Sequence, residues 1–135
     1  MSRRKGRVLA FQALYSWDVS QTPLEDLLKF SWQNVQASED SDETSFASII
    51  VTGTIEHVAQ IDELIKNHLS ANWTMERINK VTLAILRMSI YEMEFQKDSQ
   101  KKIVIDEAVN IAREYGLEDS YKFINAVLDK IGKEN

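Results

Sequence analysis

The stretch that decides the fold is INKVTLAILRMSIYEMEF, residues 78–95. Apolar residues occupy positions nearly all round a helix drawn through it, and a helix of that kind is buried among others. We therefore expect it in the middle of a helical bundle. Arg87 interrupts the run, and a bare guanidinium is costly to bury. We expect a carboxylate beside it, with Glu107 and Glu92 as candidates, or a partner that faces it.

The rest of the chain is also typical of helices, because one proline and four glycines in 135 residues leave little material for turns. Periodicity predicts further helices at about residues 4–19, from 22 onward, 44–69, 102–115, and from 118–120 to 131. Thr22, Pro23 and Glu25 have the pattern of a capping box at a helix start. Gly53 indicates a close helix crossing or a bend, and Gly116 and Gly132 are expected to follow helix ends.

The sequence thus predicts an all-α fold of about six to seven helices, in one compact domain with helical halves at about 1–70 and 71–135. Between the second and third predicted helices lies ASEDSDET, residues 37–44, which is rich in acids and has no large apolar side chain. We expect a loop there. It is either a solvated linker or a docking surface for a basic partner.

Several classes of function are excluded. The chain has no cysteine, so it has no disulfides, thiolate metal sites or cysteine nucleophiles. Its glycines are too scattered to cradle a phosphate. His57 and His68 lie about 16 Å apart along a helix, too far to share a metal ion. We expect no enzyme activity, cofactor or metal, and no transmembrane helix, because no apolar run reaches 18 residues.

The first residues carry a local basic charge. Arg3, Arg4, Lys5 and Arg7 are four of the chain's 16 basic residues, and without them 12 basic residues face 21 acidic ones, a net charge of −9. A polyanion contact is therefore expected near the N-terminus alone.

The predicted first helix carries two stripes. One contains Arg4, Val8, Phe11 and Tyr15, and lies about a third of a turn from the natural core stripe of Ala10, Ala13, Leu14 and Trp17. Arginine beside exposed aromatic rings favours single-stranded RNA, whose phosphates bind the guanidinium and whose bases stack on the rings. The alternative is that the basic residues form a solubilising tail and that Phe11 and Tyr15 belong to the core.

A family resemblance covers almost the whole chain. It rests on RRKGR (3–7), QALYSW (12–17), VTGTIEHVAQIDELI (51–65), AILRMSIYE (84–92), IDEAVNIAREYG (105–116) and DSYKFINAVLDK (119–130). These blocks resemble, in matching order, the NusB family of bacterial transcription antitermination factors. The resemblance implies two small helical bundles packed together in a non-catalytic, cytoplasmic, RNA-binding adaptor. Its implied partners are boxA RNA, NusE, which is a small-subunit ribosomal protein, and the RNA polymerase complex that reads through terminators, notably in ribosomal RNA operons.

The resemblance also implies site residues. The arginine-rich start of the family maps to Arg3, Arg4, Lys5 and Arg7, the tyrosine of QALY is Tyr15, and the start of the last helix supplies Asp119, Lys122 and Phe123. Asp119 is also expected to cap that helix. The residues that contact NusE are not assigned, and the oligomeric state stays open between monomer and homodimer.

The chain departs from the family pattern at a few positions. Gly6 replaces an alanine, which lowers helix propensity and favours an arm that is disordered until RNA binds. Other departures are Asp106, Ala126 and the stretch DSQ at 98–100. The competing hypothesis is a helical protein-interaction module without an RNA role.

Overall fold

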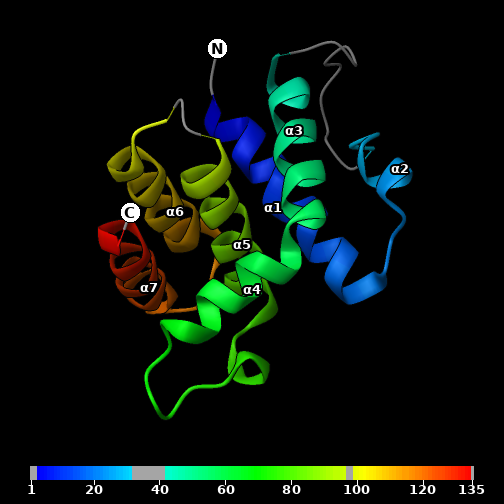
Figure 1. Ribbon diagram of the computed structural model, residues 1–135. Helices are drawn as coiled ribbons and strands as arrows, with labels where there is room; N and C mark the ends of the chain where they lie inside the picture. The colour runs from blue at the N-terminus through cyan, green and yellow to red at the C-terminus, as the bar shows by residue number, and fades with distance from the viewer. Residues whose placement is uncertain (1–2, 32–41, 97–98, 135) are drawn as a thin grey trace.

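The computed structural model describes residues 3–31, 42–96 and 99–134, and every regular element in these ranges is a helix. The prediction of an all-α fold is confirmed (Figure 1). The elements are α1 (Arg3–Ser20), α2 (Leu24–Leu27), α3 (Asp42–Glu56), α4 (Val58–Asn67), the 3-10 helix η1 (Met75–Arg77), α5 (Lys80–Phe95), α6 (Lys101–Tyr115) and α7 (Ser120–Glu134).

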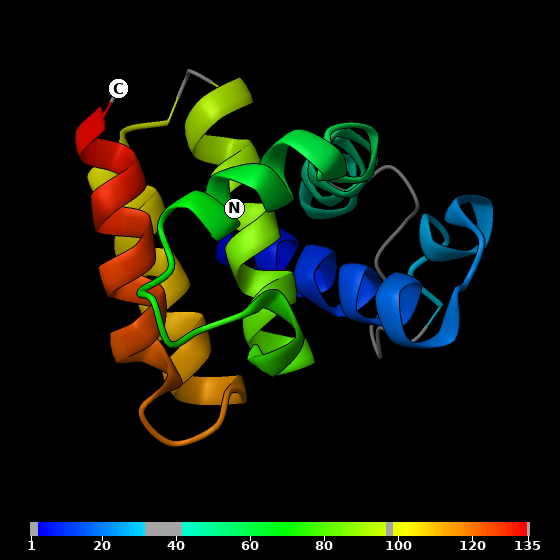
Figure 2. The same cartoon turned by 60° about the horizontal axis from the view of Figure 1, so that its bottom comes forward.

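Helix α5 is the centre of the molecule, as its apolar sequence predicted. Every residue from Thr82 to Met93 is buried, and α5 contacts α1, α3, α4, α6 and α7. In Figures 1 and 2, α1 and α3 lie on one side of α5, and α6 and α7 lie on the other. Asn79 fixes where α5 begins, because its side-chain oxygen accepts hydrogen bonds from the backbone amides of Val81 and Thr82.

The single helix predicted over 44–69 is two helices. α3 and α4 are separated at His57, whose φ of −111° and ψ of 16° leave the helical region. Gly53 lies in α3 where that helix crosses α5, and a Cβ added there would lie 2.1 Å from Cζ of Tyr91. The predicted close crossing at Gly53 is confirmed, and the bend lies four residues later.

Other helix ends differ from prediction. The capping box at Thr22 is wrong, since Pro23 takes the N-cap position of α2 and the Thr22 hydroxyl donates to the Ser16 carbonyl at 3.5 Å. α7 passes through Gly132 and continues to Glu134. Residues 37–41 of the predicted acidic loop lie outside the described residues, and α3 begins at Asp42.

Arg87 has the carboxylate partners that its burial requires, but they are not the predicted ones. It donates from Nε and Nη2 to the two carboxylate oxygens of Asp62, both at 2.9 Å, and Nη1 lies 3.4 Å from Asp18. These contacts join α5 to α4 and α1. Glu92 and Glu107, the predicted partners, pair with arginines of α1 instead.

Two further expectations concern the chain as a whole. None of the helices in the described part of the chain is long and apolar enough to cross a membrane. The predicted division into helical halves near residue 70 falls between α4 and η1, and it stays a prediction.

Candidate nucleic-acid interface

The first turns of α1 hold the basic residues, so the arm is helical from Arg3 onward. The sequence had left open whether the arm is ordered without RNA. The Arg3 guanidinium lies 4.8 Å from the ring centre of Phe46, and it donates to the Ser99 hydroxyl at 3.3 Å. Lys5 is exposed. Packing against α3 and the segment before α6 therefore holds this helix start despite the low helix propensity of Gly6.

Arg4 is accessible but not free of protein contacts. Its side chain is 40% exposed, and its Nε lies 3.4 Å from Glu107 while Nη1 lies 4.0 Å from Glu114, both on α6. Ion pairs this exposed contribute at most about 1 kcal/mol. A phosphate can therefore compete with either carboxylate for this guanidinium.

Arg7 differs from the other three cations, because it is buried. It donates from Nε and Nη2 to both carboxylate oxygens of Glu92, and Nη1 lies 3.9 Å from Glu107. Burial alone lowers the pKa of Arg7, but the hydrogen bond to Glu92 and the charges of Glu92 and Glu107 outweigh it and raise that pKa. The guanidinium is thus a charged structural group that is not exposed to a phosphate.

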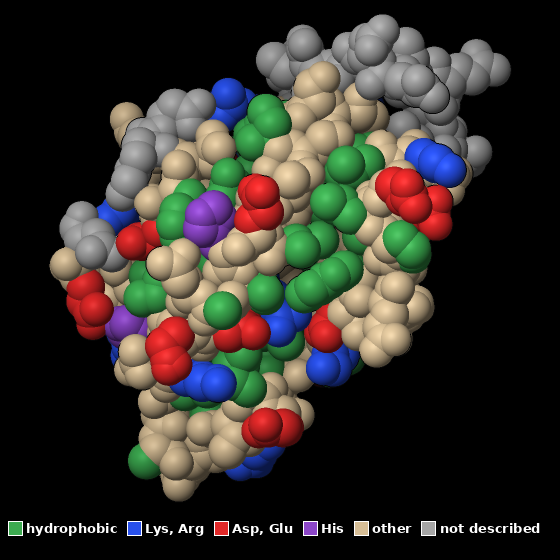
Figure 3. Space-filling view, turned by 45° about the vertical axis from the view of Figure 1, so that its right-hand side comes forward, with side chains coloured by type: hydrophobic (Ala, Val, Ile, Leu, Met, Phe, Trp, Pro, Cys, Tyr) green, Lys and Arg blue, Asp and Glu red, His purple; other side chains and the backbone are tan. Residues whose placement is uncertain are grey.

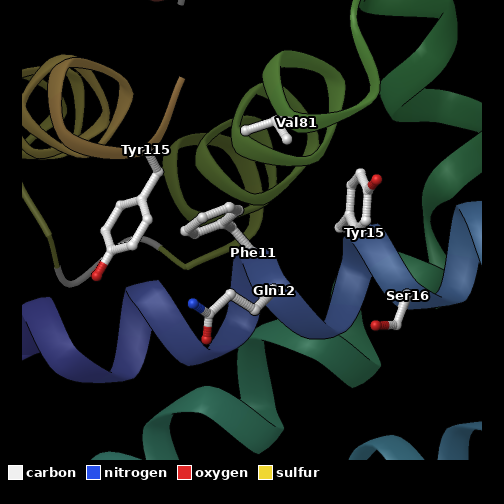
Figure 4. Close-up of a pocket in the computed structure, with 6 residues that line it drawn as sticks. All are labelled: Phe11, Gln12, Tyr15, Ser16, Val81 and Tyr115. Carbon is white, nitrogen blue, oxygen red and sulfur yellow. The ribbon is translucent and has the colours of Figure 1, made fainter. Parts of the chain in front are cut away.

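The first of two hollows lies between α1 and α6 (Figure 4). We call it the α1 hollow; it encloses about 350 Å³ and is lined by Phe11, Gln12, Tyr15, Ser16, Val81 and Tyr115. Phe11 is buried, with its ring centre 5.3 Å from that of Tyr115. Tyr15 and Tyr115, 38% and 42% exposed, lie on either side of Phe11. Two accessible rings thus flank an apolar floor, as a stacked base requires.

The second hollow lies at the start of α7, and we call it the α7 hollow. It encloses about 290 Å³ and is lined by Trp73, Arg77, Ile78, Asn79, Thr82, Leu117, Glu118, Asp119, Ser120 and Phe123. Two predicted site residues, Asp119 and Phe123, are therefore in it. Lys122 lies beside it, with Nζ 3.5 Å from the Asp119 carboxylate.

Asp119 shapes the turn before α7. Its φ is 69°, a left-handed conformation that aspartate adopts more readily than most residues. Its carboxylate lies toward Lys122, and both side chains are exposed. The predicted cap at this position stays a prediction.

Some lining residues of the two hollows are neighbours in the chain. Val81 lines the α1 hollow and Thr82 the α7 hollow, and Tyr115 and Leu117 bear the same relation at the end of α6. The structure thus places Tyr15 in one hollow and Asp119 and Phe123 together in the other. Sequence analysis missed Tyr115 and Trp73, because their rings pack on Phe11 and Phe123, which are distant in the chain. It also missed Arg77, which lies over the Trp73 ring.

Metal binding is one function that the described residues do not support. No group of three or more histidine or acidic side chains there could hold a metal ion. The face in Figure 3 shows basic and acidic side chains intermingled. A polyanion would therefore meet no extended positive field on that face, and its binding depends on local contacts.

Comparison with known proteins shows consistent similarity along the chain. Residues 4–133 match the NusB family. The transcription antitermination protein NusB of Treponema denticola is 51% identical over 97% of this chain and 96% of that protein. A solved structure of T. maritima NusB is 33% identical, with a TM-score of 0.86 over all of this chain and 93% of the other. A structure of antitermination factors NusB and NusE in complex with dsRNA is 29% identical, with a TM-score of 0.86 over 98% of this chain and 97% of the matched one.

Proposed function

The chain belongs to the NusB family, and on that premise we propose that it is a transcription antitermination factor, a non-catalytic adaptor that binds RNA together with a protein partner. A similar chain is part of a solved assembly of NusB, NusE and dsRNA. By that likeness we propose NusE and the RNA polymerase antitermination complex as partners, boxA RNA as the ligand and the cytoplasm as the location.

The observation that carries the proposal is a series of accessible side chains at the start of α1, at Tyr15 and at the start of α7. Arg3, Arg4 and Lys5 are at the start of α1, about 16 Å along the helix from Tyr15. Tyr15 lines the α1 hollow, and the α7 hollow contains Asp119 and Phe123. Phosphates would bind at the cations and unpaired bases at the rings, which is the arrangement that single-stranded RNA prefers.

The arm is tested by the salt dependence of RNA binding. Three cations can contact phosphates, since Arg7 is buried. Each phosphate contact on a single strand contributes about 0.7 to the slope of log affinity against log salt. Replacing Arg3, Arg4 and Lys5 with glutamine should therefore flatten that slope by about 1.4–2 units, and the lower value applies if cation uptake by Glu107 and Glu114 offsets the share of Arg4.

A matched control removes the same charge elsewhere. Replacing Lys66, Lys102 and Lys133 with glutamine changes the net charge equally, and these residues line neither hollow. This control should keep the slope. Equal slopes in the wild type and both triple variants would show that the arm does not bind RNA.

The aromatic contact is tested by Tyr15→Ala, with affinity for a boxA oligonucleotide measured with and without NusE. Loss of a stacked base should weaken binding by roughly 1–3 kcal/mol. A lower melting temperature with unchanged RNA affinity would instead assign Tyr15 to the core. If the wild-type protein does not prefer boxA to a scrambled RNA either with or without NusE, the RNA role is refuted and the protein-interaction module is favoured.

A further inference from the structure

We propose that the groove between α6 and α7 docks a helix of a protein partner, one that carries an acidic side chain and, one turn away, a basic one. The groove encloses about 430 Å³. It shares no lining residue with the α1 hollow or the α7 hollow, so it is a separate surface, and the inference goes beyond the proposed function. We call it the α6–α7 groove, and its charged walls and its glycine are Lys101, Lys102, Asp106, Asp129, Gly132 and Lys133.

The charges of the groove are separated along its length. α6 and α7 are antiparallel (Figure 2), and Lys101 Nζ donates to the Gly132 carbonyl at 3.3 Å, so the start of α6 lies beside the end of α7. The three lysines are therefore at this end. The two aspartates are four residues from Lys102 and Lys133, about 6 Å farther along each wall. The groove thus has a basic end and an acidic end one helical turn apart.

These charges are accessible to a partner. Lys102 pairs with Asp106 at 3.4 Å and Lys133 pairs with Asp129 at 3.2 Å, each within its own helix, and all four side chains are more than half exposed. Ion pairs this exposed are weak, so charged groups of a partner can replace them. An acid at the basic end and a base at the acidic end would complement the groove.

Folding alone does not explain two residues of this groove. Lys102 is in the first turn of α6, where an acid would stabilise the helix. Gly132 lies inside α7, where alanine is the better helix former. A Cβ there would lie 3.3 Å from Cε of Met93, the end of a flexible side chain, so packing does not require glycine as it does at Gly53. Residues that break a local rule without a gain in folding tend to mark functional sites.

The walls favour a helix over an extended segment. Both walls are helices that pair their own backbone groups, so an extended segment would leave its N–H and C=O groups without partners, whereas a helix pairs its own. The lining of α7 extends from Asn125 to Lys133, about 12 Å or two helical turns. Ile105, which is partly buried, offers an apolar contact, and the absent side chain of Gly132 allows a close approach.

RNA fits this groove less well than a helix does. Asp106 and Asp129 line it and would repel the phosphates of a strand. The structural alternative is that the two charged pairs only solvate α6 and α7, and that Gly132 precedes the end of α7 without any role in binding.

The test titrates the isotope-labelled full chain with an alanine-based helical peptide that carries one glutamate and, four residues later, one lysine. Peptides with two glutamates or two lysines at those positions are the controls. NMR should show that the mixed peptide shifts the backbone amides of Ile105 and Gly132. It should bind roughly 2- to 5-fold more tightly than either control peptide, which is the contribution of one exposed ion pair.

A change of preference tests the charge pattern. Asp106→Lys combined with Asp129→Lys makes the groove basic throughout, so the peptide with two glutamates should become the tightest ligand. Asp26→Lys combined with Glu63→Lys changes the net charge equally at exposed sites outside the groove. This control should keep the preference for the mixed peptide.

Gly132→Ala tests the close approach. It should weaken binding of the mixed peptide and leave the melting temperature unchanged or higher, a combination that a glycine with a structural role alone would not produce.

A test in cells asks whether the groove has a natural partner. Exchanging the charges of both groove pairs (Lys102→Asp, Asp106→Lys, Asp129→Lys and Lys133→Asp) keeps the net charge. Read-through of a terminator should fall when this variant is the cell's copy of the chain, while its RNA affinity in vitro stays unchanged. Exchanging Asp26 and Lys29, an exposed pair on α2 and the residues after it, is the control and should have no effect.

The outcomes separate this inference from the proposed function. Equal affinity for the three peptides, an unchanged preference in the double lysine variant, or unchanged read-through after the charge exchange would overturn the inference alone. Self-association of the wild type that the exchange abolishes would make the groove a dimer interface and would also overturn it. A wild type that prefers the mixed peptide but neither binds boxA RNA nor supports read-through would refute the proposed function instead.

Discussion

Replacing Arg7 with alanine should destabilise the fold severely. Arg7 donates two hydrogen bonds to Glu92, and the two side chains are only 6% and 1% exposed. Removing one partner of a buried ion pair leaves the other charge uncompensated, at a cost of about 3–5 kcal/mol. Glu107 lies 3.9 Å from Arg7, so the variant would leave a second carboxylate near the first. We therefore expect the upper half of that range.

The assay is urea unfolding followed by circular dichroism, together with thermal melting. For a chain of this size the loss corresponds to a fall in melting temperature of roughly 10–20 °C. Lys5→Ala is the matched control, because it removes an exposed cation from the same end of α1, and it should change stability by less than about 0.5 kcal/mol. The double variant Arg7→Met with Glu92→Met should recover most of the loss, since apolar replacement of a buried pair is often neutral or stabilising.

RNA affinity should rank these variants in the opposite order from stability. At a temperature where Lys5→Ala and the double variant Arg7→Met with Glu92→Met are both folded, Lys5→Ala should lower RNA affinity and the double variant should not. The reasoning would be refuted by an Arg7→Ala protein that has the melting temperature of the wild type but a lower RNA affinity. That result would mean that Arg7 binds RNA phosphates.

Two further predictions concern the helix crossing and a histidine. Gly53→Ala should lower the free energy of unfolding in urea by about 3 kcal/mol, because its Cβ would overlap the Tyr91 ring. Gly132→Ala is the control: its added Cβ would lie 3.3 Å from its nearest neighbour, and it should be neutral or stabilising. Equal effects at the two glycines would contradict the close crossing. The pKa of His68 is raised by its hydrogen bond to the Leu64 carbonyl and by Glu134, against the opposing effects of burial and Lys130. Protonated His68 therefore stabilises the fold fully below its ordinary pKa of about 6.5, and this stabilisation is lost as the pH rises through the higher pKa of the folded state. The free energy of unfolding, measured at pH 6 and 8.5, should show this loss. Glu134→Gln should make the loss smaller.

Features that depend on local sequence were predictable. The apolar run of α5 predicted its burial, because no face of that helix could be left in water. Gly53 was predicted as a close helix crossing or a bend, because a glycine inside a helix needs a structural reason. The burial of Arg7 also had a local signal that went unused: it lies three and seven residues before Ala10 and Leu14, on the core stripe of α1.

Features that depend on contacts between distant segments were not predictable. Asp62 and Asp18 became the partners of Arg87 because α4 and α1 pack against α5. Trp73 and Phe123 are 50 positions apart and meet only when the loop before η1 lies on α7. Periodicity specifies which face of a helix is apolar, but it does not specify which neighbour covers that face.

The two carboxylates beside Arg4 have a consequence for selectivity. A phosphate that binds Arg4 must displace Glu107 and Glu114, and each displaced carboxylate then attracts a cation from solution. That uptake offsets the counterion released from the RNA, so the net ion exchange at this contact is small. Arg4 would thus exchange one anion for another, with no net gain in charge neutralisation. A polyanion that offers charge alone would gain little binding free energy at Arg4. Selection of one RNA over another would depend on what the bases contact farther along the strand.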